Sequence, residues 1–256
     1  MRASFWFRRQ ARTLCDIDGR LWGTSPQPFP VSSITFEMFE DFAADEFSGC
    51  AVGIDLGTTN TVVSIMRDGR VELIKNEEGG FLHPSVVAFT RSGGELVGER
   101  ARRRRIVDPQ NTIFSAKRLI GRPFDTPEVQ EAISRLPYKV QAGSNQEPMV
   151  TTRVGTLPII DISSFVLRHI KELAEAQLDQ AVTHCVVTVP AHFADGQRAA
   201  TRKAAERAGF EVLRVLNEPT AAAIAYGLNR NLEQRIAIFD LGGGTFDVTI
   251  LDIRGN

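Results

Sequence analysis

The chain contains the sequence Asp-Leu-Gly twice, about 185 residues apart, and each copy lies between two runs typical of β-strands. The later copy starts at Asp240, with the apolar run 236–239 before it and the alternating run 246–251 after its glycine turn. Three successive glycines at 242–244 leave backbone N–H groups uncovered, so this turn can approach a phosphate closely. Asp240 and Asp247, at the mouth of the predicted hairpin, are then placed to hold a hydrated divalent cation on that phosphate.

The earlier copy repeats this arrangement near the start of the chain. The apolar run 51–54 leads into Asp55, the turn at 56–60 is rich in small hydroxyl residues, and 61–66 returns as a strand. Either copy alone is compatible with an ordinary glycine-rich turn. Together they favour two related lobes, each of which offers one phosphate loop to a nucleotide between them.

The known kinds of phosphate loop narrow the choice of fold. A Walker loop needs Gly-x-x-x-x-Gly-Lys-Ser/Thr at the start of a helix, and the chain has no such run. A dinucleotide-binding fold also needs its glycine-rich turn to open a helix, whereas Gly244 precedes a β-branched and aromatic strand. The two-lobed ATPase design shared by actin, sugar kinases and certain chaperones remains.

Composition excludes several other classes of protein. The chain has 256 residues, of which 43% are hydrophobic and 24% charged, as expected for a soluble globular protein. Its net charge of −1 gives no general basis for binding nucleic acid or a membrane, and no apolar run approaches the roughly 20 residues of a membrane span. Cys15, Cys50 and Cys185 are too few and too scattered for a disulfide framework or a zinc site. We therefore expect a reducing compartment, the cytoplasm.

Residues 1–50 differ from the rest of the chain. The stretch 1–14 is basic and aromatic, and it lacks the apolar core of a secretory signal. A transit peptide would suit its charge, but the basic part is short and poor in serine. Aromatic residues at 36, 39 and 42 lie at helical spacing among acids, which allows a short amphipathic helix. We expect a poorly ordered extension, with organelle targeting as the alternative.

The remaining chain reads as an α/β protein. The order strand, helix, strand, helix over 184–228 predicts right-handed crossovers and a largely parallel sheet, to which the hairpins add antiparallel strands. The result is a mixed five-stranded sheet. Helices are predicted at 126–136, 161–181, 195–208 and 221–228. We expect a complete first lobe at 51–230, with a core at 51–75 and 156–230 and an outer subdomain at 76–155, and the start of a second lobe at 231–256.

Two charged residues outside the loops are candidates for chemistry, and each has an ordinary alternative. Lys117 could reach the phosphates from the opposite wall of the site, or it could be a surface lysine. Glu218 lies at a strand-to-helix junction, where a carboxylate could orient an attacking water or cap the helix. The four arginines at 102–105 are expected on a solvated helix face, and nucleic-acid binding is the disfavoured alternative.

The chain from about residue 51 to residue 253 resembles the nucleotide-binding domain of the heat-shock-protein-70, or DnaK-type, chaperones. The motifs that carry the resemblance are Ile54–Asn60 and Asp240–Asp247 for the phosphate loops, Ala116–Arg122 for the catalytic-lysine segment, Thr188–Ala191 with Gln197 and Arg198 for the crossover segment, and Asn217–Gly227. Actins and sugar kinases share the loops but neither the Lys117 segment nor the stretch 217–227. The resemblance implies an actin-like, ribonuclease H-like ATPase fold.

The resemblance also implies a role for each matched residue. The nucleotide phosphates would be bound by Thr58, Thr59, Asn60, Gly242, Gly243, Gly244 and Thr245. Mg²⁺, with K⁺ as a further candidate ion, would be held mostly through water by Asp55, Asp240 and Asp247. The catalytic residues would be Lys117, which offsets charge on the γ-phosphoryl group, and Glu218, Asp240 and Thr245, which position the water. Pro190 and Arg198 would relay the nucleotide state to a substrate domain.

The sequence departs from the family pattern in two respects. His192 and Ala194 replace the Tyr and Asn that are usual in the crossover segment, which affects the relay more than the chemistry. The chain stops at Asn256, before the rest of the second lobe with its adenosine pocket and before a peptide-binding domain. We therefore expect weak ATP binding, and poor solubility because the hairpin at 236–252 would expose sheet edges and apolar faces.

Two hypotheses for function follow. In the first, the chain is the ATP-binding and ATP-hydrolysing domain of a DnaK-type chaperone that assists protein folding in the stress response. In the second, it is a short paralogue that no longer hydrolyses ATP and binds co-chaperones or a client-bound chaperone. The presence of Lys117, Glu218, Asp240, Thr245 and Asp247 together favours the first, since a pure binding module needs no such set. A sugar-kinase-like transferase is disfavoured because no sugar-binding cluster stands out.

The family resemblance also suggests binding partners. We expect ATP/ADP, a J-domain co-chaperone and a nucleotide-exchange factor. Unfolded proteins would bind only where a substrate-binding domain is supplied elsewhere. We expect neither nucleic acid nor a membrane as a partner.

Overall fold

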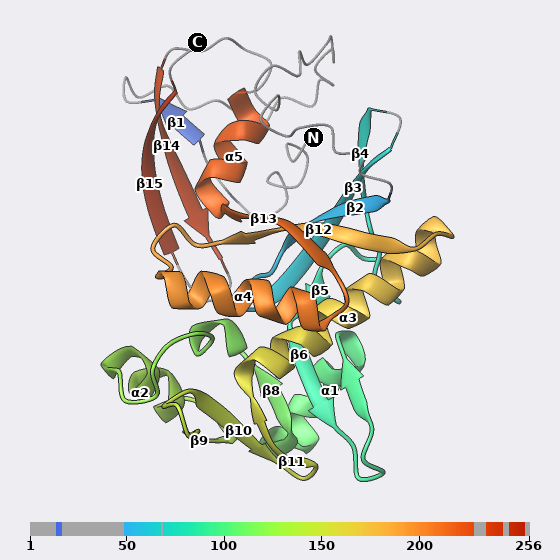
Figure 1. Ribbon diagram of the computed structural model, residues 1–256, viewed down its shortest axis with the longest axis vertical. Coiled ribbons are helices and arrows are strands. Elements are labelled where there is room, and N and C mark those ends of the chain that lie inside the picture. The colour runs from blue at the N-terminus through green and yellow to red at the C-terminus, as the bar shows by residue number, and fades with distance from the viewer. Residues whose placement is uncertain (1–13, 17–48, 68, 228–233, 243–245, 254–256) are drawn as a thin grey trace.

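The computed structural model of the chain describes residues 14–16, 49–67, 69–227, 234–242 and 246–253 (Figure 1). Its main sheet has the strand order β13-β12-β2-β3-β4, and a short sixth strand, β5, pairs with β3. These strands are β2 (Cys50–Asp55), β3 (Asn60–Arg67), β4 (Arg70–Leu73), β5 (His83–Pro84), β12 (Val182–Val189) and β13 (Glu211–Asn217). The pairs β13/β12 and β12/β2 are parallel, whereas β2/β3 and β3/β4 are antiparallel. The predicted mixed five-stranded sheet is confirmed, with β5 as an addition.

Helices cover both faces of this sheet. In Figure 1, α3 (Ile159–Leu178) and α4 (Asp195–Arg207) lie on one side of it and α5 (Glu218–Gly227) lies on the other. Alternate residues of the central strands point toward α3 and α4 and are almost fully buried: Val52, Ile54, Cys185, Val187 and Val189. This alternation is the pattern that a strand shows when only one of its faces joins the main core.

The longest helix, α3, follows the predicted apolar periodicity but has different ends. Ile162, Val166 and Ile170 are buried on its core face, as their helical spacing predicts. The helix begins at residue 159 rather than 161, and it ends at residue 178 rather than 181. It ends there because Asp179 adopts a left-handed backbone conformation (φ 53°), which stops the α-helical hydrogen-bond ladder.

A second group of elements lies on the side of α3 away from the main sheet (Figure 1). Two small antiparallel sheets, β7-β6-β8 and β11-β10-β9, belong to it. Its members are β6 (Val86–Phe89), β7 (Glu95–Val97), α1 (Glu99–Val107), η3 (Pro109–Asn111), β8 (Thr112–Phe114), η4 (Ala116–Arg118), α2 (Pro127–Ser134), β9 (Lys139–Ala142), β10 (Pro148–Thr152) and β11 (Gly155–Pro158). Buried side chains of these elements join the core of the main sheet in one continuous cluster.

The second Asp-Leu-Gly stretch forms the predicted hairpin. Strands β14 (Gln234–Leu241) and β15 (Phe246–Ile253) pair antiparallel, with residue 240 opposite residue 247. Part of the N-terminal extension, β1 (Leu14–Asp16), pairs antiparallel with the other edge of β14, although no strand was predicted there. The amphipathic helix that the spacing at 36–42 allows lies outside the described residues.

The arginine run lies on α1, as predicted, and its four side chains have partners within the chain. Arg102 pairs with Glu99, Arg103 with Glu78 and Arg104 with Asp108, while Arg105 lies 3.7 Å above the ring of Phe114. Across the described part of the chain, none of the helices combines the length and apolar character needed to cross a membrane.

Candidate functional site

The first loop is held rigidly between β2 and β3. Gly57 has no space for a side chain, because a Cβ atom there would overlap the backbone oxygen of Asn60. Ser85 supports the loop from the next segment: its Oγ donates to the Gly57 carbonyl (2.8 Å), and its N–H donates to the Thr59 carbonyl (2.9 Å). The backbone of residues 57–59 is therefore fixed before any ligand arrives.

Asp55, at the end of β2, is held by the neighbouring strand. Thr188 lies beside it in the parallel β12/β2 register, and its Oγ1 donates a 2.8 Å hydrogen bond to Asp55 Oδ1. The carboxyl ends of β2 and β12 meet at this edge of the sheet, which is the usual place for a ligand site in an open α/β sheet.

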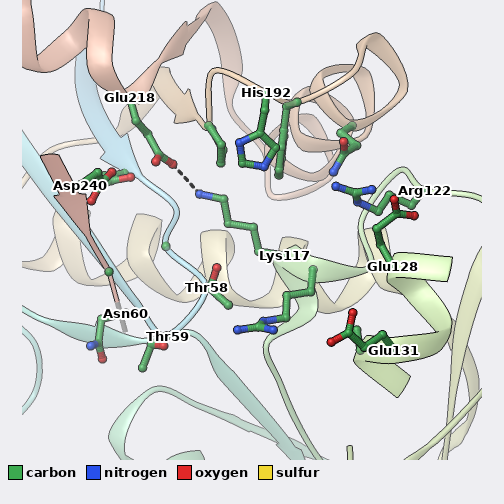
Figure 2. Close-up of a pocket in the computed structure, with 18 of the residues that line it drawn as sticks. Thr58, Thr59, Asn60, Lys117, Arg122, Glu128, Glu131, His192, Glu218 and Asp240 are labelled. Carbon is green, nitrogen blue, oxygen red and sulfur yellow. Dashed lines mark hydrogen bonds and ion pairs between the residues drawn. The ribbon is translucent and has the colours of Figure 1, made fainter. Parts of the chain in front are cut away.

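Lys117 and Glu218 meet at the centre of the site, although 101 positions separate them in sequence. Lys117 Nζ donates to Glu218 Oε1 over 2.6 Å (Figure 2). The two side chains are only 10% and 9% exposed, so this is a largely desolvated ion pair. Lys117 therefore does not have the surface position that was its alternative, and the carboxylate of Glu218 points at the lysine.

Local sequence explains how each partner of this pair is placed. Lys117 lies in the 3₁₀ turn η4, whose following residues Leu119 and Ile120 are buried and anchor the turn in the core. Glu218 is the first residue of α5, where Pro219 suits the first helical turn. Strand β13 ends directly before it, so the sheet fixes the position of its backbone.

The second hairpin brings Asp240 to the same place. Asp240 and Gly242 line the cavity into which Lys117 points. Asp247, opposite Asp240 in the hairpin, lies 3.6 Å from His192, measured from its Oδ1 to the imidazole Nδ1. Gly243, Gly244 and Thr245 lie outside the described residues.

One cavity of about 260 Å³ joins these groups (Figure 2). Nine of the residues that the sequence pointed to line it: Asp55, Thr58, Thr59, Asn60, Lys117, Pro190, Glu218, Asp240 and Gly242. Of the other candidates, Asp247 and Arg198 do not line it. The two Asp-Leu-Gly loops and the Lys117–Glu218 pair, predicted from four separate stretches of sequence, thus face one space.

Arg198 holds the crossover segment together instead. Its guanidinium donates to the carbonyl oxygens of Phe193 (3.0 Å) and Ala191 (3.3 Å) and to the side chain of Asn217 (2.6 Å). Pro190 accepts a hydrogen bond from the Phe193 N–H. Because Asn217 directly precedes Glu218, Arg198 connects the start of α4 to the strand that carries the glutamate.

Other residues that line the cavity were not predicted as site residues, although Arg118, Arg122 and Gln197 lie in the motifs that carry the family resemblance. These other residues are Arg118, Arg122, Glu128, Glu131, Ala132, Arg135, Phe193 and Gln197. Most come from η4, the segment after it and α2, and only the packing of the outer elements brings them to the cavity. His192 also lines it, and the sequence had marked this residue as a departure from the family pattern.

The carboxylates suit a hydrated Mg²⁺ rather than a metal bound directly by the protein. Asp55 and Asp240 line the cavity, whereas Asp247 faces His192. Among the described residues, no group of three or more His, Cys, Asp or Glu side chains could itself hold a metal ion. Mg²⁺ keeps several waters and binds through one or two carboxylates plus substrate phosphates, and two carboxylates beside a phosphate loop fit that description.

Cys50 and Cys185 are not reactive groups. Burial raises the pKa of the Cys185 thiol to about 12, and burial also raises the pKa of Cys50. A thiolate is the nucleophilic form of cysteine, so neither side chain is prepared for nucleophilic chemistry.

Comparison with known proteins agrees with this geometry. A sequence model of the family described as Hsp70 protein matches residues 51–256. The chain belongs to the Hsp70 family. It is also 50% identical over 212 residues to the heat shock protein SSC3, mitochondrial, of Saccharomyces cerevisiae. That match covers 83% of this chain and 33% of SSC3, so the chain spans about a third of the length of the curated relative.

Membership in the Hsp70 family confirms the resemblance and the actin-like fold that the motifs implied. Hsp70 proteins are chaperones with an ATPase domain that binds ATP or ADP with Mg²⁺. The prediction of a cytoplasmic location was wrong, since the matched Hsp70 protein SSC3 is mitochondrial. It rested on the number and spacing of the cysteines, which cannot separate one reducing compartment from another.

Proposed function

We propose that this chain is the ATP-binding and ATP-hydrolysing part of a DnaK-type Hsp70 chaperone. The observation that carries the proposal is the buried Lys117–Glu218 ion pair, which lies in the same cavity as both Asp-Leu-Gly loops. A protein that only binds a phosphate gains little from a carboxylate that neutralises its lysine. An enzyme that attacks a phosphate with water can use both groups.

In the proposed site the loops bind the phosphates. Thr58 and Thr59 offer hydroxyl and N–H donors from the loop that Ser85 fixes, and Gly242, which lines the cavity, would offer its N–H group. By the family resemblance, Gly243, Gly244 and Thr245 would bind the phosphates as well. Mg²⁺, when bound, supplies positive charge to the phosphate oxygens, and Asp55 and Asp240, which line the cavity, would hold its waters. Asp247, opposite Asp240 in the hairpin, is the third proposed carboxylate. K⁺ is a further candidate ion.

Lys117 and Glu218 would take separate roles once ATP is bound. The Lys117 ammonium would turn to the γ-phosphoryl oxygens and offset the charge that develops on them. Glu218, released from the lysine, would then accept a hydrogen bond from the attacking water, with Asp240 and Thr245 helping to position that water. The water oxygen bonds to phosphorus as the bond to the ADP oxygen breaks, which gives ADP and phosphate.

The wider assignments follow from the family and stay part of the proposal. The first lobe would comprise residues 51–230, with its core at 51–75 and 156–230 and an outer subdomain at 76–155, and the second lobe would begin at 231. Pro190 and Arg198 would relay the nucleotide state. J-domain co-chaperones, nucleotide-exchange factors and unfolded proteins are the proposed partners of the whole chaperone, and its proposed location is the mitochondrion.

Steady-state ATP hydrolysis and Mg-ATP binding by calorimetry test the proposal. Lys117→Ala should lower the hydrolysis rate by about 100- to 1,000-fold, the usual effect of removing one group that stabilises developing charge. The matched control is Lys171→Ala on α3, which removes a lysine from another 2.6 Å pair with glutamate and should leave the rate unchanged. Tight Mg-ATP binding with the same hydrolysis rate in both variants would contradict the proposal and favour a non-hydrolysing binding module.

A further inference from the structure

The turn that carries Lys117 touches α4 through two glycines. Gly121 has a positive φ of 65°, and a Cβ atom placed on it would lie 2.5 Å from the Gly196 oxygen and 2.6 Å from the Gln197 Cα. A Cβ atom on Gly196 would lie 3.2 Å from the Gly121 oxygen. The backbone of the Lys117 segment therefore rests directly on the first turn of α4, with no side chain between them.

Backbone hydrogen bonds between near neighbours in sequence join this contact to the lysine. The N–H groups of Leu119 and Ile120 both donate to the Ala116 carbonyl, and the Arg122 N–H donates to the Leu119 carbonyl. Leu119 and Ile120 are also buried in the core. Residues 116–122 thus form one compact turn, so a displacement at Gly121 moves Lys117 as well.

The α4 side of this contact is connected to Glu218. The first turn of α4 carries Arg198, whose guanidinium donates to the side chain of Asn217. Asn217 is the last residue of β13 and directly precedes Glu218. The two partners of the catalytic ion pair therefore reach the same helix turn by separate routes, one through Gly121 and one through Arg198.

We propose that Gly121 is a positioning residue for Lys117: its bare backbone seats the lysine turn against α4 and thereby sets the distance from Lys117 Nζ to Glu218. Any side chain at residue 121 would lift the turn away from α4. The catalytic consequence rests on the function proposed above, whereas the geometric consequence does not.

A cross-linking experiment on the 256-residue chain tests the geometry without nucleotide. A carbodiimide joins an amine and a carboxylate in direct contact by an amide bond with net loss of water, so Lys117 and Glu218 should yield a cross-linked peptide in mass spectrometry. Gly121→Ala should lower that yield several-fold. Gly69→Ala is the matched control, because Gly69 also has a positive φ (70°) but no atom within 4 Å of the added Cβ.

Circular dichroism and thermal unfolding show whether each variant folds. An undiminished cross-link in folded Gly121→Ala overturns the proposal. Should that variant not fold, Gly196→Ala takes its place, because its Cβ approaches the Gly121 oxygen less closely. We expect a smaller fall in cross-link yield, and a yield equal to that of the unsubstituted chain in folded Gly196→Ala also overturns the proposal.

Hydrolysis supplies a second readout that a merely structural role would not change. Gly121→Ala should lower the hydrolysis rate about 10- to 100-fold with a nearly constant Michaelis constant for ATP, the size of effect that a misplacement of about 1 Å produces. Adding Gly121→Ala to the Lys117→Ala variant should cause no further fall in the hydrolysis rate, since there is then no lysine to misplace. Additive losses would contradict a role through Lys117. A chain that shows no hydrolysis at all refutes the proposed function, and the cross-link yield then decides the positioning role by itself.

Discussion

The two hairpins that carry the Asp-Leu-Gly sequences share a local design but have different surroundings. β2 and β3 lie inside the main sheet, where β12 pairs with the outer edge of β2 and β4 pairs with the outer edge of β3. β14 and β15 belong to a three-stranded sheet with β1 on the edge of β14. In the described part of the chain, no strand pairs with the outer edge of β15.

The side chains show the same difference. In β3, Val62 and Val63 are 2% and 0% exposed, and because consecutive side chains point to opposite faces of a strand, both faces are buried here. In β15, Phe246, Val248 and Ile250 are 59%, 50% and 62% exposed along one face. Only the inner face of the second hairpin is buried, where Ile236 and Ile238 pack against Ala222 of α5.

This contrast teaches that a loop sequence specifies the chemistry of a phosphate site, whereas the neighbouring elements specify its rigidity. The first loop is fixed by Ser85 and by the absence of space at Gly57. The second hairpin is held beside the cavity by its packing against α5 and by the His192–Asp247 pair. We therefore expect the first loop to be the fixed wall of the site and the second to be the adjustable one.

The largest expected effect comes from adding a methyl group to the fixed wall. Gly57→Ala forces the Asn60 backbone to move, so Mg-ADP affinity measured by calorimetry should fall about 100-fold, equivalent to about 2.7 kcal/mol. Gly94→Ala is the control, since its Cβ would meet only a threonine hydroxyl at 3.6 Å. Equal affinities in the two variants would show that the first loop is as adjustable as the second.

A valine-to-threonine substitution in each hairpin tests whether the two hairpins differ in burial. Val63→Thr buries a hydroxyl group and should lower the free energy of unfolding by about 1–3 kcal/mol. Val248→Thr places that hydroxyl on an exposed face and should change the free energy by less than about 0.5 kcal/mol. Urea unfolding followed by circular dichroism measures both, and a large loss for Val248→Thr would mean that β15 is covered in solution.

A smaller effect is expected from removing the support of the first loop. Ser85→Ala deletes the hydroxyl that donates to the Gly57 carbonyl, a contribution of about 1 kcal/mol, so nucleotide affinity should fall about five-fold. Thr90→Ala deletes a hydroxyl that is hydrogen-bonded within an exposed turn and should leave affinity unchanged. An unchanged affinity in Ser85→Ala would assign the rigidity of the loop to Gly57 alone.

The smallest expected effect is a decline in folding stability at acidic pH. His83 lies opposite Thr61 of β3, its Nε2–H donates to the Ile74 carbonyl oxygen (3.1 Å), and its buried Nδ1 has no hydrogen-bond partner among the described residues. Burial lowers the pKa of His83 below its ordinary value of 6.5, with Glu77 opposing and His169 reinforcing the shift. The unfolded chain therefore binds this proton first as the pH falls, so stability is full above pH 6.5 and declines below it.

The slope of this decline is at most about 1.4 kcal/mol per pH unit for one group. Urea unfolding from pH 7.5 to pH 5.5 should show a shallower decline in His83→Gln than in the unsubstituted chain. The pKa of His169 is lowered in the same direction by burial, so part of the decline should remain. Identical slopes would exclude His83 as a source of acid sensitivity beside the first loop.

Local patterns were sufficient to predict much of the fold. The apolar periodicity of α3 and the strand, helix, strand, helix order around β12 and β13 predicted those elements, because burial on one face imposes a period on the sequence. Lys117 and Glu218 were candidates from the sequence, each with an ordinary alternative, and the family resemblance favoured a catalytic role for both. Their meeting at 2.6 Å could not be predicted, since it depends on how two elements 101 residues apart pack.

The features that the sequence did not predict are those set by tertiary packing. No local pattern marks Ser85 as a residue that supports the loop, because only the pairing of β5 with β3 places it beside Gly57. Likewise, the residues of α2 line the cavity only because of the way the outer elements pack. Gly121 belongs to the Lys117 motif, but the sequence does not show that its backbone lies against that of Gly196, because only the fold brings the two together. Likewise, no local pattern marks Leu14–Asp16 as a strand; its pairing with β14 is a long-range event.

The strand order also has a consequence for synthesis of the protein on the ribosome. β2 pairs with β3, which follows it at once, and with β12, which is made only after more than a hundred intervening residues. Long-range pairing of this kind is slow because a large loop must close first. The Thr188–Asp55 hydrogen bond and the Lys117–Glu218 pair each join an early segment to a late one. The first Asp-Leu-Gly loop is therefore among the first parts of the site to leave the ribosome and among the last to be completed.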